Sequence, residues 1–129
     1  MDHRVVRPHE FDWATRPHEP GEPARHVAEL SELTEMKAAR ANIWRYEPGA
    51  TGVRHRHPLQ EETFIVLAGT LSIYIGDPPT REDVPTGSAV RVAPGTPIQS
   101  ANHGVAELVV YVHGWPAGTE PAEILDPVV

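Results

Sequence analysis

The stretch GATGVRHRHPLQEETFIVLAG, residues 49–69, decides the fold and carries the main candidate site. His55 and His57 are two residues apart, so on a strand both imidazoles project from the same face. After a short loop, Glu62 shares its strand face with Phe64 and heads a row of apolar, inward-facing residues. Two imidazoles and one carboxylate on neighbouring strands suit an open site for a divalent first-row metal.

Further β-rich runs lie on both sides of this stretch. Strands are predicted over residues 39–46, 63–68, 70–75, 89–92 and 107–113. Residues 77–87 are expected to form a polar loop, and residues 25–36 are compatible with either a helix or short strands. Short strands separated by regular Gly and Pro turns indicate an all-β protein, either a sandwich or a single antiparallel barrel.

The predicted β domain spans residues 25–129 and ends in a short polar tail. Residues 1–24 contain four of the chain's 14 prolines and are expected to form an extended N-terminal arm. Phe11 and Trp13 would order this arm by packing on a neighbouring subunit or on the outer wall of the barrel. Trp44 and Tyr46 share a strand face, where core packing is expected and a place at a pocket mouth or a dimer interface is the alternative.

Composition excludes several classes of function. The chain of 129 residues contains no cysteine, which removes disulfides, thiolate metal sites and cysteine nucleophiles. A net charge of −7 argues against nucleic-acid binding, which needs clustered basic residues. No apolar run is long enough to span a membrane, and the first residues lack the apolar stretch of a secretory signal. The expected location is the cytoplasm.

The histidine stretch resembles the cupin superfamily. Gly49, His55, His57, Glu62 and Gly69 occupy every signature position of the first cupin motif. In the second motif glycines 87 and 95 and asparagine 102 match, whereas alanine 93 replaces the proline. The resemblance implies a small antiparallel jelly-roll barrel with the motif side chains pointing inward, and a homodimer, because cupins commonly dimerise.

A second position also departs from the family pattern. Many cupins carry a third histidine where this chain has Ile98, so the resemblance implies an incomplete ligand set of His55, His57 and Glu62. Such a set still suits Fe, Mn, Zn or Ni. The candidates for a fourth ligand are Gln60, Gln99, His103 and His113. Ile98, Phe64 and Gln60 are expected to line the substrate pocket.

Three functions are compatible with these residues. The first is a metal-dependent enzyme of oxygenase, isomerase or lyase type that acts on a small organic molecule. The second is a metal-free cupin that binds or senses a small molecule, and the third is a partner-binding domain with a vestigial site. Arg54 and Arg56 alternate with the histidines, so they are expected to point away from the pocket. No catalytic residue is assigned from the sequence.

Overall fold

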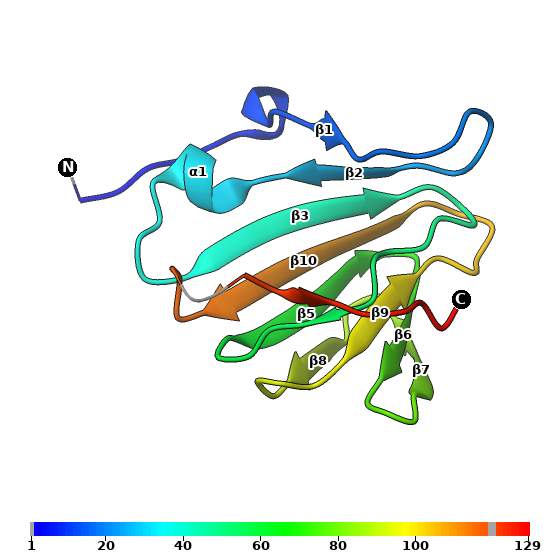
Figure 1. Ribbon diagram of the computed structural model, residues 1–129. Coiled ribbons are helices and arrows are strands. Elements are labelled where there is room, and N and C mark those ends of the chain that lie inside the picture. The colour runs from blue at the N-terminus through cyan, green and yellow to red at the C-terminus, as the bar shows by residue number, and fades with distance from the viewer. Residues whose placement is uncertain (1, 119–120) are drawn as a thin grey trace.

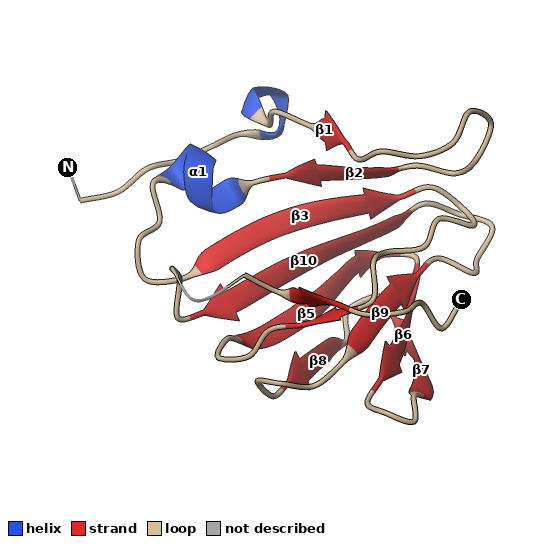
Figure 2. Ribbon diagram, viewed as in Figure 1, coloured by secondary structure: helices blue, strands red, loops and turns tan. Residues whose placement is uncertain are grey.

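Two antiparallel sheets face one another in the computed structural model, which describes residues 2–118 and 121–129 (Figures 1 and 2). The six-stranded sheet has the order β1-β2-β3-β10-β5-β8, and the five-stranded sheet has the order β11-β4-β9-β6-β7. The elements are the 3-10 helix η1 (Pro8–Glu10), β1 (Ala14–Thr15), β2 (Arg25–Ala28), α1 (Leu30–Thr34), β3 (Arg40–Tyr46), β4 (His55–Arg56), β5 (Glu61–Ala68), β6 (Thr70–Ile75), β7 (Thr80–Pro85), β8 (Ala89–Val92), β9 (Ile98–Ala101), β10 (Leu108–Trp115) and β11 (Glu123–Ile124). The expected all-β jelly roll is confirmed, as a sandwich whose two sheets do not join into one closed barrel within the described residues.

The core lies between the two sheets because alternate residues of each strand point inward. In the central strand β10, Leu108, Val110 and Val112 are buried while the residues between them are half-exposed. Facing residues of the five-stranded sheet, including Leu71 and Ile73, are fully buried. In sequence β10 is a nearly continuous apolar, β-branched run, which predicted the strand, and the structure adds the period-two burial.

The prediction for residues 77–87 was wrong, because β7 occupies most of that segment. β7 pairs with β6 along its whole length and forms the edge of the five-stranded sheet. Val84 is the one buried residue of β7, and Arg81 forms an ion pair with Asp83 at 3.0 Å. Charged residues are common on edge strands, where they discourage pairing with other chains, and they hide the alternation that identifies a strand. The ambiguous residues 25–36 contain both a strand, β2, and the short helix α1.

Part of the N-terminal segment joins the six-stranded sheet. β1 pairs with β2, and the guanidinium carbon of Arg45 lies 5.0 Å from the centre of the Trp13 ring. Phe11 packs edge-on against Trp13, with ring centres 5.9 Å apart. Trp13 therefore lies on the outer face of its own sheet, one of the two places expected for it. The division of the chain at residue 24 stays a prediction.

The last residues of the chain, drawn in red in Figure 1, run alongside β4, the strand that carries His55. β11 pairs with β4, with Ile124 opposite His55, and the Leu125 N–H donates to the carbonyl of Arg54 at 2.9 Å. β4 is only two residues long and has a single paired position with β9. This C-terminal segment thus supplies much of the backbone pairing that holds β4. None of the described helices is long and apolar enough to cross a membrane.

Candidate metal centre

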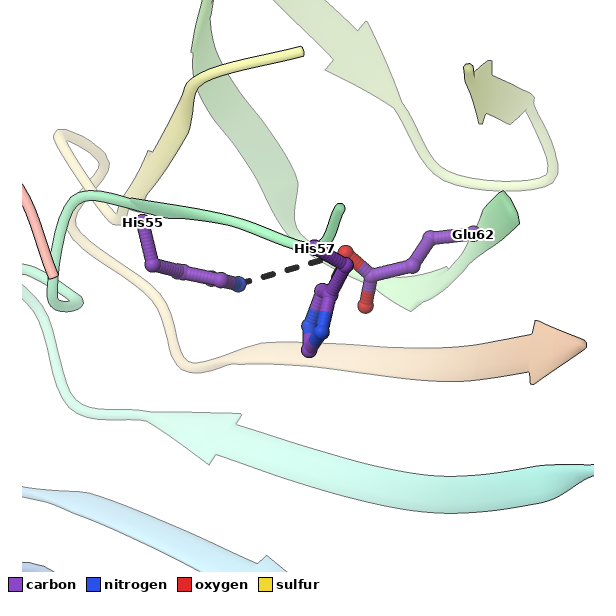
Figure 3. Close-up of side chains that lie close together, drawn as sticks. All are labelled: His55, His57 and Glu62. Atoms are coloured by element: carbon purple, nitrogen blue, oxygen red, sulfur yellow. Dashed lines mark ion pairs between the residues drawn. The ribbon is translucent and has the colours of Figure 1, made fainter. Parts of the chain in front are cut away.

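His55, His57 and Glu62 converge at one point between the sheets (Figure 3). His55 lies on β4, His57 directly after it, and Glu62 near the start of β5. The Glu62 Oε1 atom lies 3.5 Å from Nε2 of His57 and 3.9 Å from Nε2 of His55. The two imidazole rings are nearly perpendicular, with centres 5.1 Å apart. The three potential donor atoms all lie within 4.8 Å of one another.

This arrangement fits a divalent metal ion. Donors bound at about 2.0–2.2 Å from an ion lie roughly 3–3.5 Å apart, so small side-chain movements would bring all three into contact with one ion. The His55 Nδ1 atom donates to the carbonyl of Val53 at 2.8 Å. That hydrogen bond keeps the proton on Nδ1 and leaves the lone pair of Nε2 facing Glu62, as in many metal-binding histidines. The residues present could therefore hold a metal ion.

Burial shifts the pKa of each of the three groups toward its neutral form. Burial raises the pKa of Glu62 from 4.5 to about 7, and the nearby charge of Arg40 opposes only part of that rise. Burial, with the positive charges of His55 and Arg40, lowers the pKa of His57 from 6.5 to about 4. Burial also lowers the pKa of His55. Near neutral pH both imidazoles are thus free to bind an ion, and only the Glu62 proton has to leave.

A cavity of about 110 Å³ adjoins these side chains. His55 and Glu62 line one part of it, and Phe64 forms part of an apolar wall. Trp44 and Tyr46, from the inner face of β3, also line it. The cavity therefore joins a polar, ionisable side to an aromatic side. Phe64 is thus a lining residue of this cavity, and its predicted contact with a substrate stays a prediction.

The other two residues expected in the pocket lie beside this cavity and do not line it. Ile98 is paired in register with His55 but is 1% exposed and packs in the hydrophobic core. Gln60 is buried, and its Nε2 atom donates to the carbonyl of Pro116 at 3.1 Å. A Cβ atom at Gly114 would collide with the Gln60 side chain, so the glycine makes room for it.

The candidates for a fourth ligand lie in different places. The amide of Gln99 is taken up by hydrogen bonds to the backbone of residues 52, 128 and 129. His103 is exposed and bonds to the hydroxyl of Tyr74 at 2.9 Å. His113 stacks on Tyr111 on the face of β10 opposite the buried valines. Gln60 is linked to His57 through Arg40, whose Nη2 atom lies 3.5 Å from both side chains.

Two arginines of the cavity were missed at the sequence level. Arg40 begins β3 and lines the cavity together with Asn42 of the same strand face. Arg25 lines it from β2. The alternation Arg40, Asn42, Trp44 within the predicted strand was the signal for the first arginine. Arg25 carried no such signal, because the segment after residue 25 was ambiguous.

Comparison with known proteins identifies the family of this fold. The family model for the cupin domain matches residues 42–114. Similar solved structures include a sugar phosphate isomerase of the cupin superfamily from Silicibacter pomeroyi, with 21% identity, a TM-score of 0.80, and coverage of 96% of this chain and 83% of the other. The polyketide cyclase RemF from Streptomyces resistomycificus is 18% identical, with a TM-score of 0.79 and coverage of 96% and 86%. An uncharacterized double-stranded β-helix protein from Klebsiella pneumoniae is 21% identical, with a TM-score of 0.72 and coverage of 96% and 98%. The search of curated proteins finds no match. Since the family model covers more than half of the chain and spans both histidines and the glutamate, this protein belongs to the cupin domain family.

Proposed function

We propose that this protein is a metal-dependent enzyme that acts on a small organic molecule bound in the cavity. The observation that carries the proposal is the convergence of His55, His57 and Glu62 beside that cavity, with the His55 lone pair aimed at the other donors. Fe, Mn, Zn and Ni are the candidate ions, because each accepts two imidazoles and a carboxylate while leaving positions open. An ion bound there would supply Lewis-acid polarisation of a substrate oxygen, or redox chemistry if it is iron or manganese.

The side chains around the ion would position the substrate. Phe64 and Trp44 offer apolar surface, so the substrate would place its carbon skeleton against them. The sheets exclude bulk water from Glu62, which is 5% exposed, and this strengthens electrostatic interactions with a bound molecule. The reaction type we propose is isomerase or lyase chemistry, which relies on Lewis-acid polarisation, or oxygenase chemistry, which needs a redox-active ion.

A metal-free binding protein is the second candidate, and Ile98 is the observation that favours it. Its apolar side chain faces the same side of the sheets as His55 and cannot donate to an ion. In such a protein the neutral forms of His57 and Glu62 would hydrogen-bond a ligand directly.

Metal analysis separates the two candidates. The protein is produced in media supplemented with Fe, Mn, Zn or Ni, and the metal content per chain is measured. We expect about one ion per chain with at least one metal, and a higher melting temperature than after metal removal, because an ion that binds only the folded state stabilises it. Content below about one-tenth for all four metals, with no effect on melting temperature, would exclude the metal-dependent enzyme.

Reaction type is tested on the metal-loaded protein. Oxygen uptake with aromatic diols or diketones would identify an oxygenase, whereas conversion without oxygen would identify an isomerase or lyase. The expected homodimer and the expected cytoplasmic location stay predictions, and analytical ultracentrifugation would test the first of them.

A further inference from the structure

Six of the ten arginines of this chain lie close to carboxylates, and of the remaining four, Arg7 and Arg16 belong to the N-terminal arm while Arg25 and Arg40 line the cavity. Six arginines have a carboxylate oxygen within 4.0 Å: residues 4, 45, 54, 56, 81 and 91. Within residues 2–118 and 121–129, neither Arg25 nor Arg40 has such a partner, and both line the cavity beside the candidate metal centre. Glu62 is the one carboxyl group among the residues that line this cavity, so two guanidinium groups there favour a ligand that supplies further negative charge.

Arg40 is held at the edge of the cavity next to the metal centre. Its Nη2 atom makes long contacts of 3.5 Å with Nε2 of His57 and with Oε1 of Gln60. Gln60 is in turn anchored by its hydrogen bond to the Pro116 carbonyl. A guanidinium group has five N–H donors, so these contacts orient Arg40 and leave most of its donors available to a ligand.

Arg25 is oriented by aromatic rings. Its guanidinium carbon lies 5.1 Å from the centre of the Trp44 ring and 5.8 Å from that of Tyr46. Cation–π contacts of this kind hold the guanidinium group in place, and the Tyr46 hydroxyl engages at most part of its five N–H donors. Both arginines are close enough to His55 for their charges to contribute to its lowered pKa. The two guanidinium groups therefore act on the same small space as the candidate ligands.

Asn42 supplies a third, different feature of the cavity wall. Its side-chain oxygen is buried and has no hydrogen-bond partner among the described residues. Asn42 lies between Arg40 and Trp44 on the inward face of β3. A buried acceptor without a partner is rare and costly, so it is expected to receive a hydrogen bond from a bound molecule. A hydroxyl group would provide that donor.

We propose that Arg25 and Arg40 form an anion-binding subsite and that the ligand of the cavity is a small organic acid. Its carboxylate or phosphate group would be bound by the guanidinium groups, and a hydroxyl group would meet Asn42. A volume of about 110 Å³ is several times what one water needs, so the cavity accommodates a compact molecule. This inference deepens the proposed function and rests on it, because the proposed function supplies the neighbouring metal ion. Binding of the anion itself depends on the two arginines.

The test titrates the zinc-loaded protein with malonate, with inorganic phosphate and with neutral malonamide, using calorimetry. We expect at least one of the two anions to bind and malonamide not to bind, and the tighter of the two anions identifies the preferred group. Arg25→Gln and Arg40→Gln should each weaken anion binding about ten- to a hundredfold, because each removes a charge-assisted contact. Arg81→Gln, which removes the same charge from the distant edge strand, should leave binding unchanged.

Two further measurements keep the outcomes separate. Arg25→Lys and Arg40→Lys keep the charge and lose the planar fork, so they should bind the anion with intermediate affinity if the arginines contact it. Unchanged anion affinity in all four variants of Arg25 and Arg40, or binding of malonamide as tight as that of the anions, would overturn the inference. Metal content is measured on the same samples: an ion without anion binding overturns only the anion subsite. Arginine-dependent anion binding in protein stripped of metal, with no metal uptake on reloading, supports the subsite and overturns the proposed metal-dependent enzyme.

Discussion

The corner between β4 and β5 and the strand β9 both place polar side chains inside the sandwich, but they use them differently. At the corner, His55, His57 and Glu62 face one another, and their pKa shifts express the cost of burying groups that lack strong partners. On β9, Gln99 is 1% exposed, yet its amide makes four hydrogen bonds to backbone groups. A buried polar group that is fully paired stabilises the fold, whereas one that is not can bind a ligand.

Asn102, just after β9, is also buried and fully hydrogen-bonded to the backbone. Its Nδ2 atom donates to the carbonyls of Tyr46 and Ala106, each at 2.9 Å, and its Oδ1 atom accepts from the Gly104 N–H at 3.0 Å. Ile98, at the start of the strand, packs in the core. The region that resembles the second cupin motif therefore holds loops and the C-terminal segment in place, and the first motif supplies the candidate chemistry.

Removal of one imidazole from the donor group should give the largest change in metal affinity. His57→Ala deletes one of three donors. Changing a residue that only hydrogen-bonds to a metal ligand lowers metal affinity by up to about a hundredfold, so loss of the ligand itself should lower it by at least that much. Metal affinity is measured by competition with a chromogenic chelator. His103→Ala is the matched control, because His103 is exposed and outside the donor group. Equal affinity in both variants would contradict the assignment.

Gln99→Ala should destabilise the fold while leaving metal stoichiometry unchanged. The variant leaves the N–H groups of Val128 and Val129 and the carbonyl of Gly52 without their partner. The free energy of unfolding should fall by about 2–3 kcal/mol, which urea denaturation measures. Glu82→Ala, on the exposed part of β7, should change it by less than about 0.5 kcal/mol. A loss of metal with normal stability would mean that Gln99 belongs to the site.

Ile98→His would make β9 resemble the donor corner. Residues opposite one another on antiparallel strands point to the same face, so the new imidazole would lie beside that of His55. Metal affinity should rise about tenfold or more as a fourth donor is added, while the metal-free protein melts at a lower temperature because a core side chain is lost. Ile98→Val, which should cost about 1 kcal/mol and leave metal affinity unchanged, is the control. No gain in affinity with a folded variant would place the ion elsewhere.

Acidification should weaken metal binding gradually, without any change in the sequence. Glu62 has a pKa of about 7, so below that pH an ion must displace its proton, and affinity should fall about tenfold per pH unit. His57, with a pKa of about 4, adds no second proton down to about pH 5. Titrations of metal affinity between pH 5 and 8 measure this slope. Glu62→Gln should bind the ion weakly and without this dependence, and an unchanged slope in that variant would exclude Glu62 as its source.

The same groups affect the stability of the metal-free protein in opposite directions. The pKa of Glu62 is raised from 4.5 to about 7 in the folded state, so stability is lost as the pH rises through that range. The pKa of His57 is lowered from 6.5 to about 4, so its contribution is present above pH 6.5 and is lost as the pH falls toward 4.

Local sequence was sufficient for the central strands and for the donor group. The runs of β-branched and apolar residues over 63–68 and 107–113 predicted β5 and β10, and the structure adds which of their residues face the core. His55 and His57 share a face at a separation of two residues whatever the rest of the chain does. Strand β7 could not be predicted, because nearly all of its side chains are exposed and only its pairing with β6 identifies it as a strand.

By itself, the sequence determined the all-β class and the two imidazoles with a carboxylate at the head of the next strand, since these depend on alternation within a few residues. Only the tertiary structure decided that Arg25 and Arg40 enter the same cavity and that Gln99 clamps the C-terminal segment. These contacts join residues that are between 15 and 30 positions apart in the sequence, and their geometry depends on strand register across both sheets. Register of that kind is a property of the assembled sandwich, because each strand pairing constrains the next.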